Sequence, residues 1–353
     1  MKAEIPFLLS TIGLLVLIVA AKKRNLELQI LHNNDMHSRF EQTNQTGRNC
    51  STSNAEENQC YGGMARVSYV IKEYRNKAKN GGPPVLYLNA GDTYNGTFWW
   101  ALFRDQICAD YLNILKPDVM CLGNHEFDLG TAGLVAHLRK LKFPVVMANL
   151  NNSKDHPLEK IGGLMKSIVL NVTGFEIGVI GYLRNQTKNR VYLPDVDFSY
   201  EVDAINQEAK KLTKNGVKII IALGHSGFTV DKIVAKNCPL VDLVVGGHTN
   251  AFLWNGPQPD FEVIEGPYPT VITQDSGKQV PVVQAYKWTK YLGVLNVTFN
   301  KNGELINWSG QPLLLNGRYP QDPEILALNK LYTKRAQSLL TGSPPYPALY
   351  DEI

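Results

Sequence analysis

Apolar positions along the chain follow two periods, the two-residue period of strands and the 3.6-residue period of helices. Short apolar runs predict strands at residues 26–31, 85–90, 119–122, 144–150, 168–171, 175–182, 217–223 and 241–245, with several more within 280–315. Helical spacing predicts helices at residues 64–79, 131–142, 202–215 and 323–340. Because strands and helices alternate along most of the chain, the pattern predicts a single α/β domain with layered sheets flanked by helices.

Five short segments of the chain end in residues able to bind a metal ion, and most of these segments follow a predicted strand. The segments are Asp35-Met36-His37, Gly91-Asp92, Gly123-Asn124-His125-Glu126, Gly224-His225 and Gly247-His248. Loops at strand ends bring groups from distant parts of a chain together. Asp, Asn and His are ligands of zinc, manganese and iron, and a shared carboxylate can bridge two ions. The pattern therefore predicts a two-metal hydrolase acting on a phosphate ester.

Each segment taken alone is weak support for a metal site. An Asp-x-His pair occurs by chance, Asp92 equally fits a turn cap, and a lone His more often has a structural role. The Gly-Asn-His-Glu tetrad is the strongest signal, because it directly follows an apolar strand and Asp128 comes three residues after His125. There Asn124 offers a neutral oxygen ligand, while His125 faces the substrate and Asp128 sets its tautomer and basicity. Five such segments together favour the metal site. No role is predicted for His32, His137 and His156.

Other reaction classes have little support in the sequence. A serine nucleophile at Ser226 would need glycine at position 228 to form the nucleophile elbow, and that residue is Phe228. Ser226 is instead predicted to position His225. No phosphate-binding loop or dinucleotide fingerprint is present. The net charge of +4 is spread along the chain without a basic run, so nucleic-acid binding is not expected.

The N-terminus has the pattern of a secretory signal peptide. Lys2 precedes an uncharged apolar run over residues 5–21, which Lys22 and two further basic residues follow. A signal anchor at the cell surface is the alternative, because the run is near the lower limit for a membrane-spanning helix. We expect cleavage before Lys22 and no stable membrane anchor afterwards.

Glycosylation sequons and cysteines also indicate secretion. Eight N-x-S/T sequons begin at Asn44, Asn49, Asn95, Asn151, Asn171, Asn185, Asn296 and Asn307. A glycan at Asn95 would crowd the predicted site, so we expect that sequon to be empty. Of the five cysteines, Cys50 and Cys60 bracket a polar loop. In an oxidising compartment they are expected to form a disulfide contributing about 2–4 kcal/mol, with free surface thiols as the alternative. Cys121 is expected to be a buried core thiol.

The five metal-binding segments, in this order, resemble the signature of the calcineurin-like metallophosphoesterases. A wider set of segments resembles the secreted 5′-nucleotidases, a group that includes animal ecto-5′-nucleotidase and the salivary apyrases of blood-feeding arthropods. These segments are residues 31–39 (LHNNDMHSR), 89–92 (NAGD), 123–128 (GNHEFD), 222–228 (ALGHSGF), 246–250 (GGHTN) and 281–286 (PVVQAY). The resemblance spans about residues 26–332 and implies the calcineurin-like fold, with a dinuclear metal site at the strand ends.

The resemblance also implies the roles of individual residues. Two divalent ions, zinc or alternatively manganese, are expected: the first on Asp35, His37 and Asp92, joined by Asn250, and the second on Asp92, Asn124, His225 and His248. His125 and Asp128 form the implied catalytic dyad. In the implied mechanism the ions lie roughly 3.5–4 Å apart, bind the phosphate and activate a water for in-line attack. His125, as imidazolium, stabilises charge on the phosphoryl oxygens.

The implied function is extracellular, metal-dependent removal of phosphate from nucleotides. The sequence leaves open whether AMP (a 5′-nucleotidase) or ADP and ATP (an apyrase) are preferred. Residues 1–21 are assigned to the signal peptide, 22–318 to the metallophosphoesterase domain, and 319–353 to the start of a linker helix and a disordered tail from Gly342. The family's second, nucleotide-binding domain is expected to be missing, so the alternative is a catalytically weak secreted protein that binds nucleotide or metal. A monomer is expected, because family dimers associate through that domain.

Overall fold

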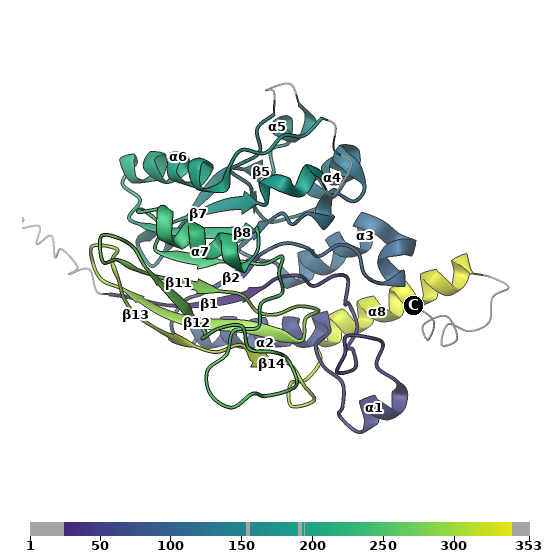
Figure 1. Ribbon diagram of the computed structural model, residues 1–353. Coiled ribbons are helices and arrows are strands. Elements are labelled where there is room, and N and C mark those ends of the chain that lie inside the picture. The colour runs from purple at the N-terminus through teal and green to yellow at the C-terminus, as the bar shows by residue number, and fades with distance from the viewer. Residues whose placement is uncertain (1–24, 153–155, 190–192, 194, 341–353) are drawn as a thin grey trace, which may run out of the picture.

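Two stacked β-sheets with helices on their outer faces make up the protein (Figure 1). The computed structural model describes residues 25–152, 156–189, 193 and 195–340. The expected signal peptide at residues 1–21 and the expected tail from Gly342 lie outside these residues. The predicted α/β architecture with layered sheets is confirmed.

The first sheet has a parallel half that carries three of the predicted metal-binding segments. Its strand order is β13 (Leu305–Gly310), β12 (Tyr291–Phe299), β1 (Leu26–Asn33), β2 (Val85–Asn89), β3 (Val119–Cys121), β4 (Val145–Val146) and β5 (Leu164–Met165), with β14 (Leu313–Leu314) paired to β12. Strands β1 to β5 run parallel to one another, and β12 and β13 extend the sheet antiparallel. The carboxyl ends of the parallel strands therefore meet at one edge.

The second sheet places the two remaining segments at an equivalent edge. Its order is β10 (Thr270–Thr273), β11 (Gln279–Val283), β9 (Leu243–Val245), β8 (Ile219–His225), β7 (Phe175–Leu183) and β6 (Ser167–Val172). The inner four strands are parallel, while β6 and β10 pair antiparallel at the edges. Every residue of β8 is buried, as expected for a parallel strand covered on both faces.

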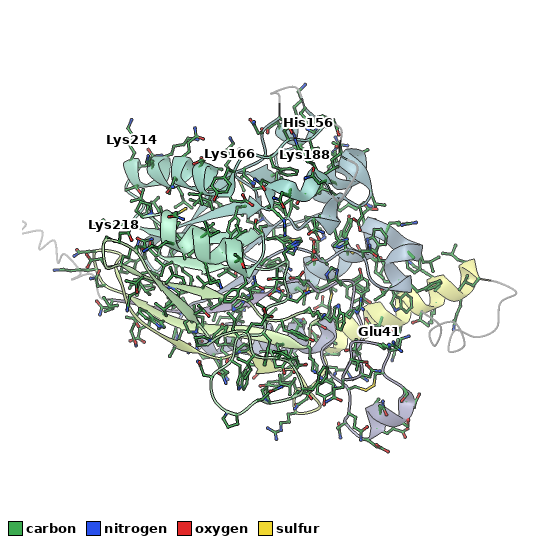
Figure 2. The ribbon with its side chains drawn as sticks, viewed as in Figure 1. Glu41, His156, Lys166, Lys188, Lys214 and Lys218 are labelled. Atoms are coloured by element: carbon green, nitrogen blue, oxygen red, sulfur yellow. A yellow bond between two sulfur atoms is a disulfide. The ribbon has the colours of Figure 1, made fainter. Side chains whose placement is uncertain are left out.

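Helices cover the outer face of each sheet. The first sheet is covered by α2 (Met64–Lys79), α3 (Phe98–Leu115), α4 (Gly130–Leu138) and α8 (Pro323–Leu339), and the second by α6 (Glu201–Lys214) and α7 (Phe228–Asn237). Short helical turns are α1 (Thr52–Glu56), α5 (Pro157–Lys160), η1 (His125–Phe127) and η2 (Asn185–Asn189). Lys214, at the end of α6, and Lys218, just before β8, lie exposed on the outside of the molecule (Figure 2).

The core has two parts, and β1 contributes to both. Leu28 and Ile30 pack in a cluster that joins the facing sides of the two sheets, while Leu31 packs in a second cluster beneath the helices of the first sheet. This division follows the two-residue period of a strand, whose successive side chains point to opposite faces. The first sheet is therefore fixed between two apolar layers, and its strand ends are held rigidly.

The cysteine predictions are confirmed, and no membrane-spanning helix is found within the described part of the chain. Cys50 and Cys60 form a disulfide. Cys121 is a buried free thiol, as are Cys108 and Cys238, for which the sequence predicted no place. Among the described residues, no helix is both long and apolar enough to cross a membrane.

Candidate metal centre

The five predicted metal-binding segments converge where strands of the two sheets end. Asp35 follows β1, Asp92 follows β2 and Asn124 follows β3. From the second sheet, His225 is the last residue of β8, and His248 comes just after β9. Segments separated by more than 200 residues are thereby brought together, and His248 N–H donates to Asp35 Oδ2 at 2.8 Å.

The backbone of these loops is held in an uncommon conformation. Positive φ angles in the left-handed region occur at Asp35 (50°), His37 (46°), Asp92 (54°), His248 (80°) and Asn250 (58°). Asp, Asn and His tolerate this region better than most residues, yet each instance carries a conformational cost. Such strain persists where the surrounding structure fixes it, and it is concentrated at functional sites. All five belong to the predicted ligand set.

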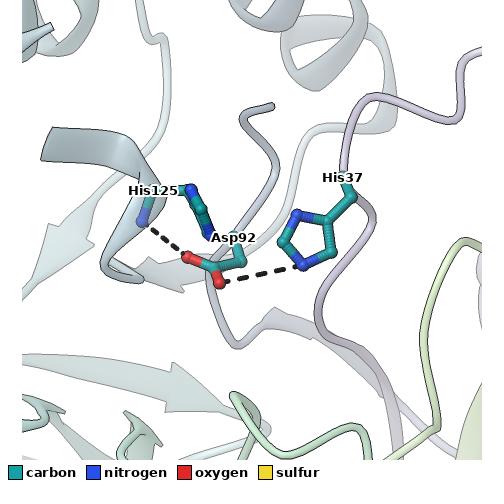
Figure 3. A group of neighbouring side chains, drawn as sticks. All are labelled: His37, Asp92 and His125. Carbon is teal, nitrogen blue, oxygen red and sulfur yellow. Dashed lines mark hydrogen bonds and ion pairs between the residues drawn. The ribbon is translucent and has the colours of Figure 1, made fainter. Parts of the chain in front are cut away.

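Asp92 lies at the centre of the site. Its Oδ2 is 2.9 Å from His225 Nε2. The same oxygen is 3.9 Å from His37 Nε2, and Oδ1 accepts a 2.9 Å hydrogen bond from the backbone N–H of His125, the two contacts drawn in Figure 3. Burial alone would raise the pKa of Asp92, but the facing charge of His225 outweighs it and holds the pKa well below its usual range. Asp92 is therefore an ionised carboxylate at the end of a strand.

Two overlapping groups of donor atoms share Asp92. In one, ligand atoms of His37, Asp92 and His125 all lie within 4.8 Å of one another, and in the other those of Asp92, His225 and His248 do. Figure 3 shows the first group, with the imidazoles of His37 and His125 on either side of the carboxylate. Asp35 joins both groups, because its Oδ1 is 3.6 Å from His37 Nε2 and 3.8 Å from His225 Nε2.

Unsatisfied oxygen atoms indicate that the site is built for cations. Asn124 Oδ1 and Asn250 Oδ1 are buried and have no hydrogen-bond partner among the described residues, although buried polar atoms are normally paired. Burial lowers the pKa of His248 to about 4, so its imidazole is neutral, the form that binds metals. A set of imidazole nitrogens, carboxylates and amide oxygens fits zinc, manganese or iron. The residues therefore fit two divalent ions.

The two ligand histidines of the first and fourth segments are oriented by backbone carbonyls. His225 Nδ1 lies 2.6 Å from the carbonyl of Ala90, and His37 Nδ1 lies 3.2 Å from that of Tyr94. A histidine that donates one ring N–H to a carbonyl presents its other nitrogen to the metal. Ser226 Oγ is buried without a hydrogen-bond partner in the described part of the chain. The prediction that Ser226 positions His225 is therefore wrong.

Glu126 has a structural role that the sequence did not reveal. Its carboxylate accepts hydrogen bonds from four backbone N–H groups, those of Asp92 (2.9 Å), Thr93 (2.7 Å), Tyr94 (3.3 Å) and Gly123 (2.6 Å). The loop after β2 is thereby tied to the loop after β3. The only indication of this role in the sequence was the position of Glu126 within the Gly-Asn-His-Glu tetrad.

A second buried carboxylate supports the loop that carries His248. Asp231 accepts from Tyr182 Oη at 2.7 Å and from Gln284 Nε2 at 2.6 Å, and Gln284 also donates to the carbonyl of Gly247 at 3.0 Å. Burial raises the pKa of Asp231 to about 7. No sequence motif marked Asp231 or Gln284, because their roles depend on contacts between distant segments.

Of the two predicted dyad residues, His125 belongs to the first donor group, and Asp128 lies next to it. His125 Nδ1 is 2.9 Å from Asp128 Oδ2. The hydrogen bond to Asp128 raises the pKa of His125 to about 9, so the imidazole is protonated at neutral pH. Because Nδ1 is taken by Asp128, Nε2 is the nitrogen left to face a ligand. The sequence predicted that His125 points at the substrate, and its proximity to Asp92 and His37 allows contact with a phosphate held there.

Comparison with known proteins gives a consistent result. The calcineurin-like phosphoesterase family model matches residues 28–252. Protein 5NUC of Lutzomyia longipalpis is 46% identical over 328 residues, covering 93% of this chain and 57% of that protein. The snake venom 5′-nucleotidase of Crotalus adamanteus is 43% identical over 310 residues, covering 87% and 51%.

A solved structure agrees with these relatives. The 5′-nucleotidase precursor of Thermus thermophilus superposes with a TM-score of 0.79 and 31% identity, covering 90% of this chain and 60% of that one. The chain spans about half the length of the curated relatives it matches. With the family model matching well over half of its residues, the chain belongs to the calcineurin-like phosphoesterase family, and its relatives there are the 5′-nucleotidases.

Proposed function

We propose that the protein is an extracellular, metal-dependent phosphohydrolase that removes phosphate from nucleotides. The observation that carries this proposal is the pair of donor groups that share buried Asp92, one of which contains His125, paired in turn with Asp128. The substrate class follows from the relatives, which are named 5′-nucleotidases. Two cations and a protonated imidazole around one small volume suit a phosphate monoester, whose charge they would neutralise.

The ligand assignment is part of the proposal. Asp35, His37, Asp92 and Asn250 would hold one ion, and Asp92, Asn124, His225 and His248 the other. Such ions, when bound, polarise phosphoryl oxygens and lower the pKa of a bound water. Zinc is the proposed metal, with manganese as the alternative, because both accept this mixture of nitrogen and oxygen ligands.

The chain's own residues would orient the phosphate and neutralise its charge. His125 carries a proton on Nε2 at neutral pH, and this N–H would donate to a phosphoryl oxygen as charge develops there. Asp128 would keep that proton in place by stabilising the imidazolium and fixing the ring plane through Nδ1. Glu126 would keep Asp92 in register with the loop that carries His125, since it binds both loops.

The extracellular location has separate support. The Cys50–Cys60 disulfide fits an oxidising compartment, the chain carries eight sequons, and one relative is a venom protein. A cleavable signal peptide over residues 1–21 would deliver the chain there. Glycan analysis of the secreted protein tests this location independently of catalysis.

Phosphate release from AMP, ADP and ATP by the purified chain tests the proposed activity. The assay is run with added zinc or manganese, with chelator, and with His125→Ala. We expect chelator-sensitive release, two bound ions in both proteins, and loss of most turnover in the variant. The ranking of the substrates decides between a nucleotidase and an apyrase. Absence of release from all three nucleotides in a protein with two bound ions would overturn the proposal, and near-normal turnover in His125→Ala would overturn the role of that residue.

A further inference from the structure

One sequon of the chain lies directly beside the metal centre. Asn95-Gly96-Thr97 connects the loop of Asp92 to the start of α3. We propose that Asn95 is a positioning residue for the His125–Asp128 pair, and that its sequon has to remain unmodified for turnover. The first half of this inference rests on the proposed function, because it assumes that the pair takes part in phosphate release.

The contact that carries the inference is a hydrogen bond to the dyad carboxylate. Asn95 Nδ2 donates to Asp128 Oδ2 at 3.0 Å, and the same oxygen lies 2.9 Å from His125 Nδ1. Asp128 follows the single turn of η1, and its side chain is mostly buried. Two donors from different loops therefore fix one oxygen, and through it the plane of the His125 imidazole.

The carboxamide of Asn95 is held at both ends. Its Oδ1 accepts a 2.6 Å hydrogen bond from the backbone N–H of Gly96 while its nitrogen donates to Asp128. This arrangement defines which end is nitrogen, because an amide oxygen facing a carboxylate would meet an acceptor with an acceptor. Asn95 also has a φ of 62°, a left-handed conformation that Asn tolerates better than most residues. Side chain and backbone thus both favour asparagine at this position.

The loop that carries Asn95 is anchored to the loop that carries His37. Arg39 Nη1 donates to the carbonyl of Gly96 at 2.6 Å and to that of His37 at 2.7 Å. Gly96 has a φ of 111°, a conformation that favours glycine. Arg39 therefore links the residue after Asn95 to the backbone of His37.

Glycosylation would act on the atom that makes this contact. Transfer of a sugar from its activated pyrophosphate-linked carrier forms a bond between the sugar C1 and Asn95 Nδ2. The nitrogen loses one hydrogen as a proton, and the carrier pyrophosphate leaves. The sugar would then begin at an atom 3.0 Å from Asp128. The sequence predicted an empty sequon because of its closeness to Asp92. The structure adds that a glycosylated nitrogen would keep one N–H for Asp128 but would place the sugar beside the dyad.

Three variants separate the positioning role from the sequon. Asn95→Gly removes the carboxamide without straining the left-handed backbone. Asn95→Asp keeps the size of the side chain but replaces the donor with an acceptor facing Asp128. Thr97→Ala is the sequon control: it leaves the Asn95 amide intact, and besides the sequon it removes the 3.2 Å hydrogen bond from Thr97 Oγ1 to the carbonyl of Ser38.

We expect Asn95→Gly to lower kcat about 10- to 100-fold, the usual size for a lost orienting partner. Asn95→Asp should lower kcat at least as much, and Thr97→Ala should stay close to the unsubstituted protein. KM for AMP and the number of bound ions should be unchanged in all three. Peptide mass spectrometry of the secreted protein should find Asn95 without a glycan.

The outcomes distinguish this inference from the proposed function. An active protein whose Asn95→Gly variant keeps normal kcat overturns the positioning role and leaves the proposed function standing. A glycan at Asn95 in protein that turns over overturns the sequon half. If the unsubstituted protein releases no phosphate, the proposed function fails first, and the imidazole resonances of His125 in an NMR spectrum still test the contact. Asn95→Gly should then shift the Nδ1 resonance, and an unchanged resonance overturns the inference.

Discussion

Two buried polar clusters of this protein differ in how their charges are satisfied. In the metal centre, defined by the proposed ligands, two amide oxygens have no partner among the described residues and the ionised carboxylate of Asp92 faces imidazoles. In the other, here called the Lys290 cluster, the ammonium of Lys290 contacts Glu262, Asp260 (2.7 Å) and the carbonyl of Gln45 (3.2 Å). Tyr291 Oη donates to Glu262 at 2.7 Å.

The difference separates a structural role from a binding role. Buried charges that meet their counter-charges within the chain hold segments together, and in the Lys290 cluster these segments are three loops distant in sequence. Buried acceptors left without donors carry a free-energy cost that a bound cation removes. The metal centre has such acceptors on strained backbone. In the Lys290 cluster the one carboxylate oxygen without a hydrogen bond among the described residues, Asp260 Oδ2, lies 2.7 Å from the Lys290 ammonium. Burial of charge alone would not have distinguished the two.

The largest expected effect comes from removing the carboxylate shared by both donor groups. Asp92→Ala should lose bound metal at both positions and lower phosphate release by at least about 100-fold, more than a partner outside the ligand set would cost. Metal content by mass spectrometry and release from AMP measure this. Asp197→Ala, at an exposed carboxylate paired with Lys188, is the control and should keep both. Two ions retained in Asp92→Ala would contradict the shared-ligand assignment.

Breaking the Lys290 cluster should affect stability instead of metal content. Lys290→Met leaves Glu262 buried without its cation and is expected to cost about 3–5 kcal/mol of unfolding free energy. The fold should still bind two ions at temperatures where it stays folded. Urea unfolding with parallel metal analysis measures both quantities, and Lys330→Met, at an exposed position of α8, is the control. Metal loss as complete as in Asp92→Ala would show that the two clusters are not separate.

Glu126 lies between these cases, because it is a satisfied buried carboxylate that touches the metal centre. Glu126→Gln keeps the shape of the side chain but turns part of it into a donor facing four backbone N–H groups. We expect metal affinity to fall about 10- to 100-fold, with a loss of about 1–3 kcal/mol of stability. Competition with a fluorescent chelator measures the affinity, and Glu159→Gln, exposed on α5, is the control. Unchanged affinity would assign Glu126 to the fold alone.

The sequence predicted those helices and strands whose apolar residues repeat with a single period, helical or extended, along their whole length. Helix α2 begins and ends at the predicted residues, Met64 and Lys79, and the strands predicted at residues 168–171 and 175–182 are β6 and β7, which pair antiparallel. Helix α3 was not predicted, because Arg104 adopts a non-helical conformation (φ 53°, ψ −134°) that breaks the helix in two and interrupts its apolar face. The predicted strand at residues 144–150 shortens to β4, Val145–Val146, because few of its residues pair with neighbouring strands.

The candidate site was predictable where each ligand follows an apolar strand. Asp92 and Asn124 could be found this way, since the end of a parallel strand places them at the shared edge. The supports of those ligands could not, because they are backbone contacts between distant segments. The carbonyl of Ala90 that orients His225 has no sequence signal, and Asn95 was noticed only as a sequon. Contacts of this kind depend on the folded geometry of loops, which periodicity does not describe.

The smallest expected effect comes from His137. It tests whether a buried side chain without a hydrogen-bond partner is, for that reason alone, part of a binding site. His137 is fully buried, and its ring nitrogens make no hydrogen bond of standard geometry among the described residues, with the backbone of Asp105 as the nearest polar group acting on its pKa. Among the described residues, His137 belongs to neither group of metal-binding side chains. Its ring packs edge-on against Tyr94, with 4.9 Å between the ring centroids. Burial lowers the pKa of His137 from 6.5 to about 4. The folded protein therefore holds it neutral where the unfolded chain would protonate it.

The sign of the pH effect follows from this shift. Well above pH 6.5 neither state binds the proton, so His137 contributes no pH dependence there. As pH falls through 6.5 towards 4, the unfolded chain gains a proton that the folded protein lacks. Between pH 7 and 5.5 the protein should lose about 1 kcal/mol more unfolding free energy than His137→Leu, which has nothing to protonate. Urea unfolding at the two pH values measures the difference, and metal content should not change. Equal losses in the two proteins would mean that His137 has a partner in solution, and a loss of metal in the variant would mean that an unpaired buried histidine does belong to the metal centre.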